Sequence, residues 1–146
     1  MKNYKQATAS KEVMDILQEI YHHEIAGVNR YLHYSFMIMG HNRIPIQKWF
    51  RDQANESSAH AITIGEKITS YGGHPSMTSP RIEESNLHSV DQILKESLEF
   101  EAEGLELYKK LVKSAGDDIA LEELAREFVK LETDHLDEVF KMLRRD

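Results

Sequence analysis

The chain contains no cysteine, and this absence excludes several kinds of chemistry at once. Disulfide bonds, thiolate zinc sites, iron–sulfur clusters and cysteine nucleophiles all need thiol side chains. The sequence also has no run of about 18 apolar residues, so it predicts no membrane-spanning helix. The start of the chain, Met1–Lys5, lacks the apolar segment of a secretory leader. We therefore expect a cytoplasmic protein that does not associate with membranes.

Basic residues are outnumbered by acidic ones. The sequence has 18 lysines and arginines against 25 aspartates and glutamates, and its formal net charge is −7. Nucleic acids repel such a surface, whereas cations are mildly favoured, so we expect no binding to DNA or RNA. Nothing resembles a nucleophile elbow, a phosphate-binding loop or a nucleotide fingerprint. The composition points away from nucleic acids, nucleotides and serine or cysteine nucleophiles.

Only three prolines and seven glycines interrupt the chain. The segments between them carry apolar residues at intervals of three and four, which is the period of an amphipathic helix. Ser10 can cap a first helix, and Pro45 suits the first turn of a second. Ser89-Val90-Asp91-Gln92 is a capping box that opens a third helix, and Asp118 can cap a fourth. The predicted helices span residues 10–39, 45–71, 89–115 and 118–144.

A long connection over about residues 72–88 separates the two pairs of helices, and it contains Pro75 and Pro80. Two helical hairpins joined by such a link are typical of a four-helix bundle with one crossover connection. At 146 residues the chain can bury one core but is short for two. We predict an all-α four-helix bundle of two antiparallel hairpins, forming a single domain over residues 1–146.

Acidic side chains and a histidine lie on the apolar stripes of these helices, where a charge needs compensation. Glu24 and Glu101 each have apolar neighbours three or four residues away on both sides, and His60 lies on the second helix. Glu132 and His135 are three residues apart, hence about 60° apart around a helix, and can reach one ion. Taken singly, each glutamate fits a boundary residue whose head reaches water. Because all four helices place such a group near mid-length, the pattern predicts a carboxylate-bridged metal site.

The order of these residues resembles the bacterioferritin branch of the ferritin-like superfamily from about residue 13 to 143. The features that carry the resemblance are Glu24 with Asn29 and Tyr31, His60-Ala61, Leu98-Glu99-Phe100-Glu101 with Gly104, and Glu132-x-x-His135. The resemblance implies a ferritin-like four-helix bundle with a di-metal site.

Each matching residue takes a role from this resemblance. Glu24 and Glu101 would be single carboxylate ligands, and His60 would be the histidine of one Glu-x-x-His pair. Glu132 and His135 would form the other pair. Tyr31 would lie beside the site as a redox-accessible residue, although an aromatic in the core is an equally good interpretation.

The chain departs from the family at one ligand, because the glutamate expected three residues before His60 is Ser57. Measured around the helix from His60, Ser57 lies at about +60°, facing inward, and Glu56 at about −40°, at the edge of the apolar stripe. Glu56 could reach the metals by a rotamer change or a local bulge. Otherwise one metal position lacks an anionic ligand. The sequence leaves both alternatives open.

Two related arrangements are not expected. The axial methionine of bacterioferritin haem lies two residues before the histidine, where this chain has Ser58, so haem is not predicted. Asp52 and Glu56 match a helix motif of the mini-ferritins, but that family also needs histidines where Ile25 and Met37 stand. The remaining histidines form no second ligand set, and we expect them at the surface: His22, His23, His33, His41, His74 and His88.

Carboxylate and imidazole ligands without sulfur suit iron or manganese, with zinc as a substitute. The resemblance implies two iron ions per subunit that are oxidised from Fe(II) to Fe(III) by dioxygen or peroxide, for storage or detoxification. Two alternatives remain: a di-metal oxidase or peroxidase on the same fold, and a subunit with an impaired site that acts as a structural partner. We also expect a homo-oligomer, at least a dimer, with a cage left open. Candidate interface residues are Tyr21, Tyr34, Phe36 and Trp49.

Overall fold

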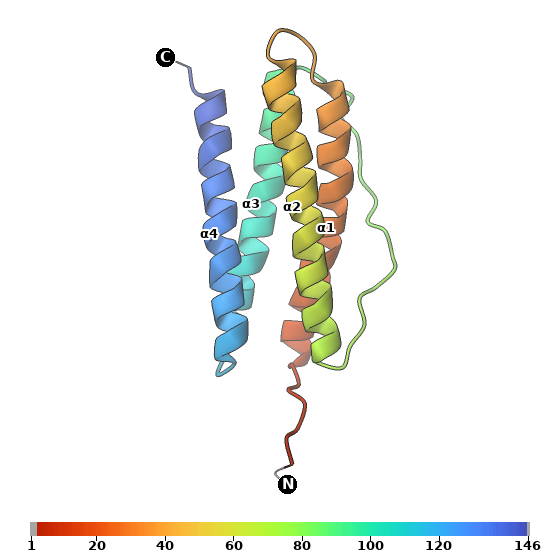
Figure 1. The fold of residues 1–146 in the computed structure, drawn as a ribbon, viewed down its shortest axis with the longest axis vertical. Helices are drawn as coiled ribbons and strands as arrows, with labels where there is room; N and C mark the ends of the chain where they lie inside the picture. The colour runs from red at the N-terminus through yellow and green to blue at the C-terminus, as the bar shows by residue number, and fades with distance from the viewer. Residues whose placement is uncertain (1–2, 146) are drawn as a thin grey trace.

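The computed structural model describes residues 3–145, and within that range the chain forms four long helices and no strand (Figure 1). The helices are α1 (Lys11–Met37), α2 (Arg43–Ser70), α3 (Val90–Ser114) and α4 (Ile119–Leu143). The predicted all-α four-helix bundle is therefore confirmed, with ends one or two residues from the predicted ones. The single domain over residues 1–146 stays a prediction, and residues 1, 2 and 146 lie outside the described residues.

Side-chain caps set the starts of three helices. Ser10, Ser89 and Asp118 each accept a hydrogen bond of 3.1 Å from the backbone amide three residues further on. Each bond satisfies an amide that has no partner in the first helical turn. Asn42, which precedes α2, makes no such bond, but Pro45 lies in the first turn of that helix, where its missing N–H costs nothing.

The crossover between the hairpins determines how the helices face one another. Residues 71–89 run the length of the bundle along the outside of α1, so α2 and α3 point the same way, while α1 and α3 are antiparallel (Figure 1). Close backbone packing joins α1 to α2, α3 to α4 and α1 to α3, but the α carbons of α2 and α4 stay more than 8 Å apart. The bundle therefore has a wider seam between α2 and α4.

A band of polar side chains divides the apolar core in two. One apolar cluster includes Leu17, Ile64, Ile68, Leu111 and Leu121. The other includes Ile38, Phe50, Ile93, Leu94 and Val139. On every helix the band falls between the two clusters, and its members are 4–7 % exposed: Glu24, Ser57, His60, Glu101 and Glu132. Because a buried carboxylate is costly unless its charge is compensated, the band must contain that compensation.

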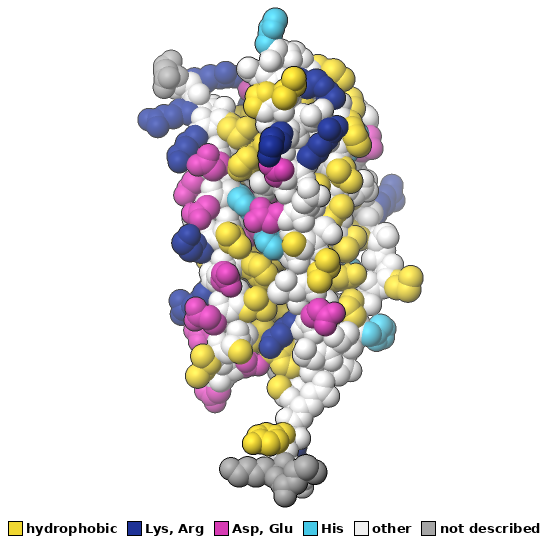
Figure 2. Space-filling view, in the orientation of Figure 1, with side chains coloured by type: hydrophobic (Ala, Val, Ile, Leu, Met, Phe, Trp, Pro, Cys, Tyr) yellow, Lys and Arg dark blue, Asp and Glu magenta, His cyan; other side chains and the backbone are white. Residues whose placement is uncertain are grey.

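The seam brings polar side chains next to this band toward the surface, since the side chains of His135 and Glu56 are 14 % and 31 % exposed. Figure 2 shows histidine and acidic side chains exposed together about midway along the bundle, between α4 and α2. Lysines, arginines and acids cover much of α4 in the same view. No helix within residues 3–145 has the length and apolar character needed to cross a bilayer.

Candidate metal centre

Six side chains with metal-binding atoms meet at the middle of the bundle. They come from all four helices: Glu24 from α1, Glu56 and His60 from α2, Glu101 from α3, and Glu132 and His135 from α4. The structure thus brings together all six residues that the sequence singled out. Continuous helices hold them, so their positions depend on helix packing and not on loops.

Two overlapping groups can each surround one ion. In the first, one ligand atom each of Glu24, His60 and Glu132 lies within 4.8 Å of the others, and in the second the same holds for Glu101, Glu132 and His135. Glu132 belongs to both groups. Its Oε1 lies 3.5 Å from His60 Nδ1, and its Oε2 lies 3.7 Å from His135 Nδ1. Glu132 therefore faces one histidine with each of its two oxygens and could contribute to both groups.

Two histidine nitrogens at this place have no hydrogen-bond partner. His60 Nδ1 and His135 Nδ1 are both buried and unbonded, and the nearest carboxylate oxygens are beyond good hydrogen-bond distance. A buried nitrogen without a partner is costly in a native protein. A metal ion would satisfy each nitrogen together with the neighbouring carboxylates. The residues present therefore fit a pair of metal ions.

Glu56 reaches this cluster from the seam between α2 and α4. Its Oε2 lies 2.9 Å from His135 Nε2, and its Oε1 lies 3.8 Å from His60 Nε2. The side chain is 31 % exposed, against 6 % for that of Glu132. No bulge is needed, since α2 is one continuous α-helix. Of the two alternatives left by the sequence, the geometry favours a Glu56 that reaches inward.

Ser57 occupies the inward position of α2, as its helical angle predicts, but it is packed against α1. A Cβ added at Gly27 would lie 2.8 Å from Ser57 Oγ and 3.2 Å from Phe100 Cε1. Such contacts are closer than atoms tolerate unless the serine hydroxyl and the Phe100 ring move, so the glycine favours the close approach of α1 and α2 here. A longer side chain at position 57 would have to leave the serine rotamer or separate α1 from α2.

Two buried tyrosines donate hydrogen bonds to carboxylates of the cluster. Tyr31 donates to Glu101 Oε1, and Tyr108 donates to Glu24 Oε1 at 2.9 Å. Tyr31 thus lies beside the cluster, where the resemblance placed it. Tyr108 is not among the site residues predicted from the sequence. The signal that could have identified it is spacing: Tyr108 follows Glu101 by seven residues, as Tyr31 follows Glu24.

The charged groups of the cluster change one another's pKa values. Burial by itself lowers the pKa of both histidines, but the neighbouring carboxylates raise it by more. For His60 these carboxylates are Glu132 and Glu24. For His135 they are Glu132 and Glu56. The pKa rises to about 9 for His60 and about 10 for His135. Burial, with the nearby Glu132, raises the pKa of Glu101 well above its usual range. Without metal, the neighbouring carboxylates therefore favour the protonated form of both imidazoles, and a bound cation would displace those protons.

One expectation is corrected, because three of the histidines expected at the surface are half-buried: His22, His33 and His23. Among them, His23 lies against α3. Its ring stacks on Phe100, with centroids 3.9 Å apart and planes at 10°, and burial lowers its pKa to about 4. The space is provided by Gly104, where a Cβ would lie 2.7 Å from His23 Nε2. Helical angles place His23 away from Glu24 but do not reveal this space on α3.

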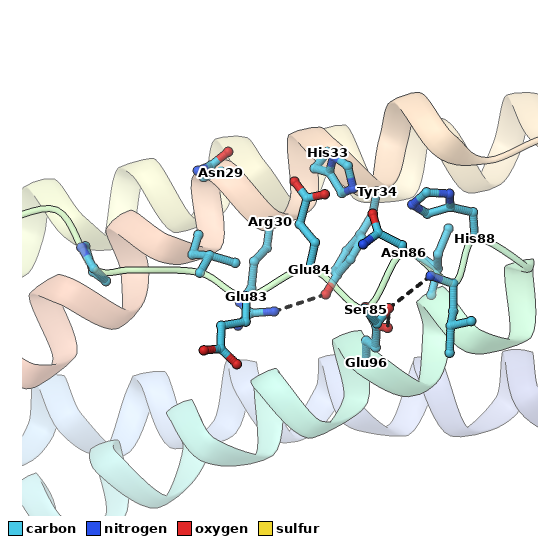
Figure 3. A pocket seen from close by; sticks show the side chains of 14 residues that line it. Asn29, Arg30, His33, Tyr34, Glu83, Glu84, Ser85, Asn86, His88 and Glu96 are labelled. Carbon is cyan, nitrogen blue, oxygen red and sulfur yellow. Dashed lines mark hydrogen bonds between the residues drawn. The ribbon is translucent and has the colours of Figure 1, made fainter.

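A cavity of about 170 Å³ lies apart from the metal-binding side chains, beneath the crossover (Figure 3). Arg30, His33 and Tyr34 of α1 line it together with Glu96 of α3 and residues of the crossover. Arg30 donates a hydrogen bond of 3.4 Å to the Tyr34 hydroxyl. None of the six clustered side chains lines this cavity, so it is separate from the candidate metal centre.

The fold and the site together define a class: four-helix bundles with a crossover and a carboxylate-rich centre. The family model described as "Ferritin: Ferritin-like domain" matches residues 14–146. The chain therefore belongs to the ferritin-like domain family, and the predicted membership is confirmed. A comparison with curated proteins gave no match.

Solved structures show the same fold. Ferritin-like, diiron-carboxylate proteins from Bacillus anthracis str. Ames superpose with a TM-score of 0.86 at 24 % identity, covering 92 % of this chain and 96 % of theirs. A Rhodobacter capsulatus bacterioferritin, with a metal-free dinuclear site and a haem iron, gives a TM-score of 0.82 at 17 % identity. That match covers 94 % of this chain and 86 % of the bacterioferritin.

Proposed function

We propose that this protein binds two iron ions at the six-residue cluster and oxidises Fe(II) to Fe(III) with dioxygen or peroxide, for iron storage or detoxification. The arrangement of Glu132 between two unpartnered histidine nitrogens carries the proposal. Ligand sets that share a carboxylate hold two cations close together, and this oxygen-rich set suits iron or manganese, with zinc as a substitute. Membership of the ferritin-like family supports the same conclusion.

Fe(II) supplies the electrons of this reaction, one from each ion, and a two-electron oxidant such as dioxygen or peroxide accepts them. The chain's own residues do the rest. Glu24 and His60 would serve one ion, Glu101 and His135 the other, and Glu132 both. The apolar clusters on either side restrict water to the seam, and the Glu56 carboxylate there gives an approaching cation its first anionic contact.

The geometry argues against the alternative of a subunit with an impaired site. That alternative rested on Ser57 as a missing carboxylate, whereas Glu56 places a carboxylate beside both histidines. An oxidase for an organic substrate would need an open space at Glu101. Here Glu101 is 6 % exposed and is hydrogen-bonded to Tyr31.

Metal content and iron oxidation test the proposal. Protein prepared metal-free and loaded with Fe(II) without oxygen should bind two irons per chain and oxidise them when dioxygen is admitted. Glu101→Gln should lose at least one iron and most of the oxidation rate, because it removes a buried carboxylate of one group. Glu103→Gln makes the same change at an exposed position of the same helix and should behave as wild type. Fewer than one iron per chain, or equal loss in both variants, would overturn the proposal.

We also propose that the chain self-associates through the α1–α2 hairpin. Large apolar side chains are exposed on this hairpin and its turn: Leu32, Phe36, Met39, Ile44 and Ile62. Of the residues considered from sequence, Phe36 is 55 % exposed, but Tyr34 is buried and Trp49 packs edge-on against His135 with centroids 6.2 Å apart. Light scattering should therefore show Phe36→Glu in a smaller state than wild type.

A further inference from the structure

The chain repeats one two-residue pattern on α1 and α3. Glu24 and Tyr31 lie seven residues apart on α1, and Glu101 and Tyr108 lie seven apart on α3. Seven residues are almost two full helical turns, so the glutamate and the tyrosine of each helix lie on one face, about 10 Å apart along the axis. Each helix therefore presents a carboxylate and a phenol in line.

Helices α1 and α3 pack against each other in opposite directions, so their two glutamate–tyrosine pairs run in opposite directions (Figure 1). The tyrosine of each helix comes level with the glutamate of the other, so Tyr31 donates to Glu101 and Tyr108 donates to Glu24. All four side chains are at most 6 % exposed. Within residues 3–145, each of these two carboxylates thus accepts a hydrogen bond from the tyrosine of the other helix.

Each tyrosine belongs to a different metal group. Glu24 Oε1, which accepts the bond from Tyr108, lies 3.6 Å from His60 Nδ1 in the first group. Glu101, which accepts the bond from Tyr31, belongs to the group with His135. When a bound cation keeps the carboxylate ionised, a hydrogen bond to it is among the stronger ones and restricts how the carboxylate turns. Partners of this kind orient metal ligands and affect affinity by 10- to 100-fold.

We propose that Tyr108 is a positioning residue for the metal held by Glu24, His60 and Glu132, as Tyr31 is for the metal held at Glu101. The two tyrosines form a crossed pair, one for each ion, and removing either hydroxyl weakens one metal position selectively. This inference rests on the proposed two-metal site. It adds a role for Tyr108 and assigns each tyrosine to a different metal position.

Cobalt(II) titration tests the inference without relying on iron oxidation, since the absorption of bound cobalt reports its ligand geometry. Single-position backgrounds separate the two ions: Glu101→Gln leaves the first group intact, and Glu24→Gln leaves the second. In Glu101→Gln, adding Tyr108→Phe should weaken cobalt binding about 10- to 100-fold and change its spectrum, whereas Tyr31→Phe should change neither. In Glu24→Gln the expectation is reversed: Tyr31→Phe should weaken cobalt binding and change its spectrum, whereas Tyr108→Phe should change neither.

Tyr34→Phe is the matched control, because it removes another buried tyrosine hydroxyl that contacts Arg30 and none of the cluster carboxylates. Tyr108→Leu, measured in parallel, changes the packing differently, so the result does not depend on the fold of one variant. Circular dichroism of each metal-free variant shows whether the bundle is intact.

The outcomes separate the two proposals. Crossed dependence on Tyr108 and Tyr31 supports the inference. If wild type binds two cobalt ions but the tyrosine variants weaken both positions equally or neither, the inference is overturned and the two-metal site stands. If wild type binds no cobalt and no iron, the proposed function fails, and the inference fails with it.

Discussion

Replacing Glu56 with glutamine tests whether the carboxylate in the α2–α4 seam acts on both metal ions. The change preserves the shape of the side chain and removes one negative charge. Glu56 Oε2 lies 2.9 Å from His135 Nε2 and Oε1 lies 3.8 Å from His60 Nε2. The charge is therefore next to one histidine of each group, and both ions should bind more weakly.

The size of the effect follows from distance and exposure. Two unit charges 4 Å apart interact by about 1 kcal/mol in bulk water and by about 4 kcal/mol at the effective dielectric constant of a protein surface. Glu56 is 31 % exposed, so water screens part of its attraction for a divalent ion. A loss of about 2–3 kcal/mol per ion is expected, which corresponds to roughly 30- to 150-fold weaker binding.

Zinc competition against a chromophoric chelator measures this change for both ions. Asp52→Asn is the control, because Asp52 lies one turn earlier on α2 and pairs with Lys48 at 2.6 Å, with its side chain 54 % exposed. That variant should bind zinc within about threefold of wild type, as expected for a screened surface charge. Unchanged affinity in Glu56→Gln, or a loss confined to one ion, would refute the view that Glu56 serves both positions.

Three further changes have expected outcomes. Ser57→Glu should lower the free energy of unfolding of the metal-free protein by about 1–3 kcal/mol in urea, because Gly27 leaves no room beside Ser57; equal stability would show that the helices can yield. Zinc at about 100 times its dissociation constant should stabilise the protein by about 2.7 kcal/mol per site and raise Tm by roughly 5–10 °C per site, reversed by chelator; no shift would contradict a built site. His23 has its pKa lowered to about 4 by burial, so below pH 6.5 the unfolded chain takes up the proton first. Wild type should lose up to about 3 kcal/mol relative to His23→Gln between pH 6.5 and 4, and a pH-independent difference in urea unfolding would exclude this cause.

Local signals in the sequence account for the helices. Apolar spacing marks the buried faces, and the caps at Ser10, Ser89 and Asp118 form as predicted because each involves atoms within four residues of one another. Acids on an apolar stripe likewise identified the candidate ligands, since a buried carboxylate is rare without compensation. Helical angles also placed Ser57 inward correctly.

Angles around one helix say nothing about the distance to the next helix. The predictions for Glu56 and His23 were incomplete for this reason. The helical angle of Glu56 puts it at the edge of its stripe, but the width of the α2–α4 seam decides that it reaches His135. His23 is half-buried because Gly104 of α3 leaves space opposite it.

The sequence by itself determined the four helices, their apolar faces and the chemical type of the candidate site, because these depend on periodicity and side-chain chemistry. Tertiary structure alone decided which groups of different helices meet: Glu132 with His60, and Tyr108 with Glu24. Those contacts join residues from different helices, as many as 84 positions apart in the chain. They depend on the direction, register and separation of packed helices, which no local pattern encodes.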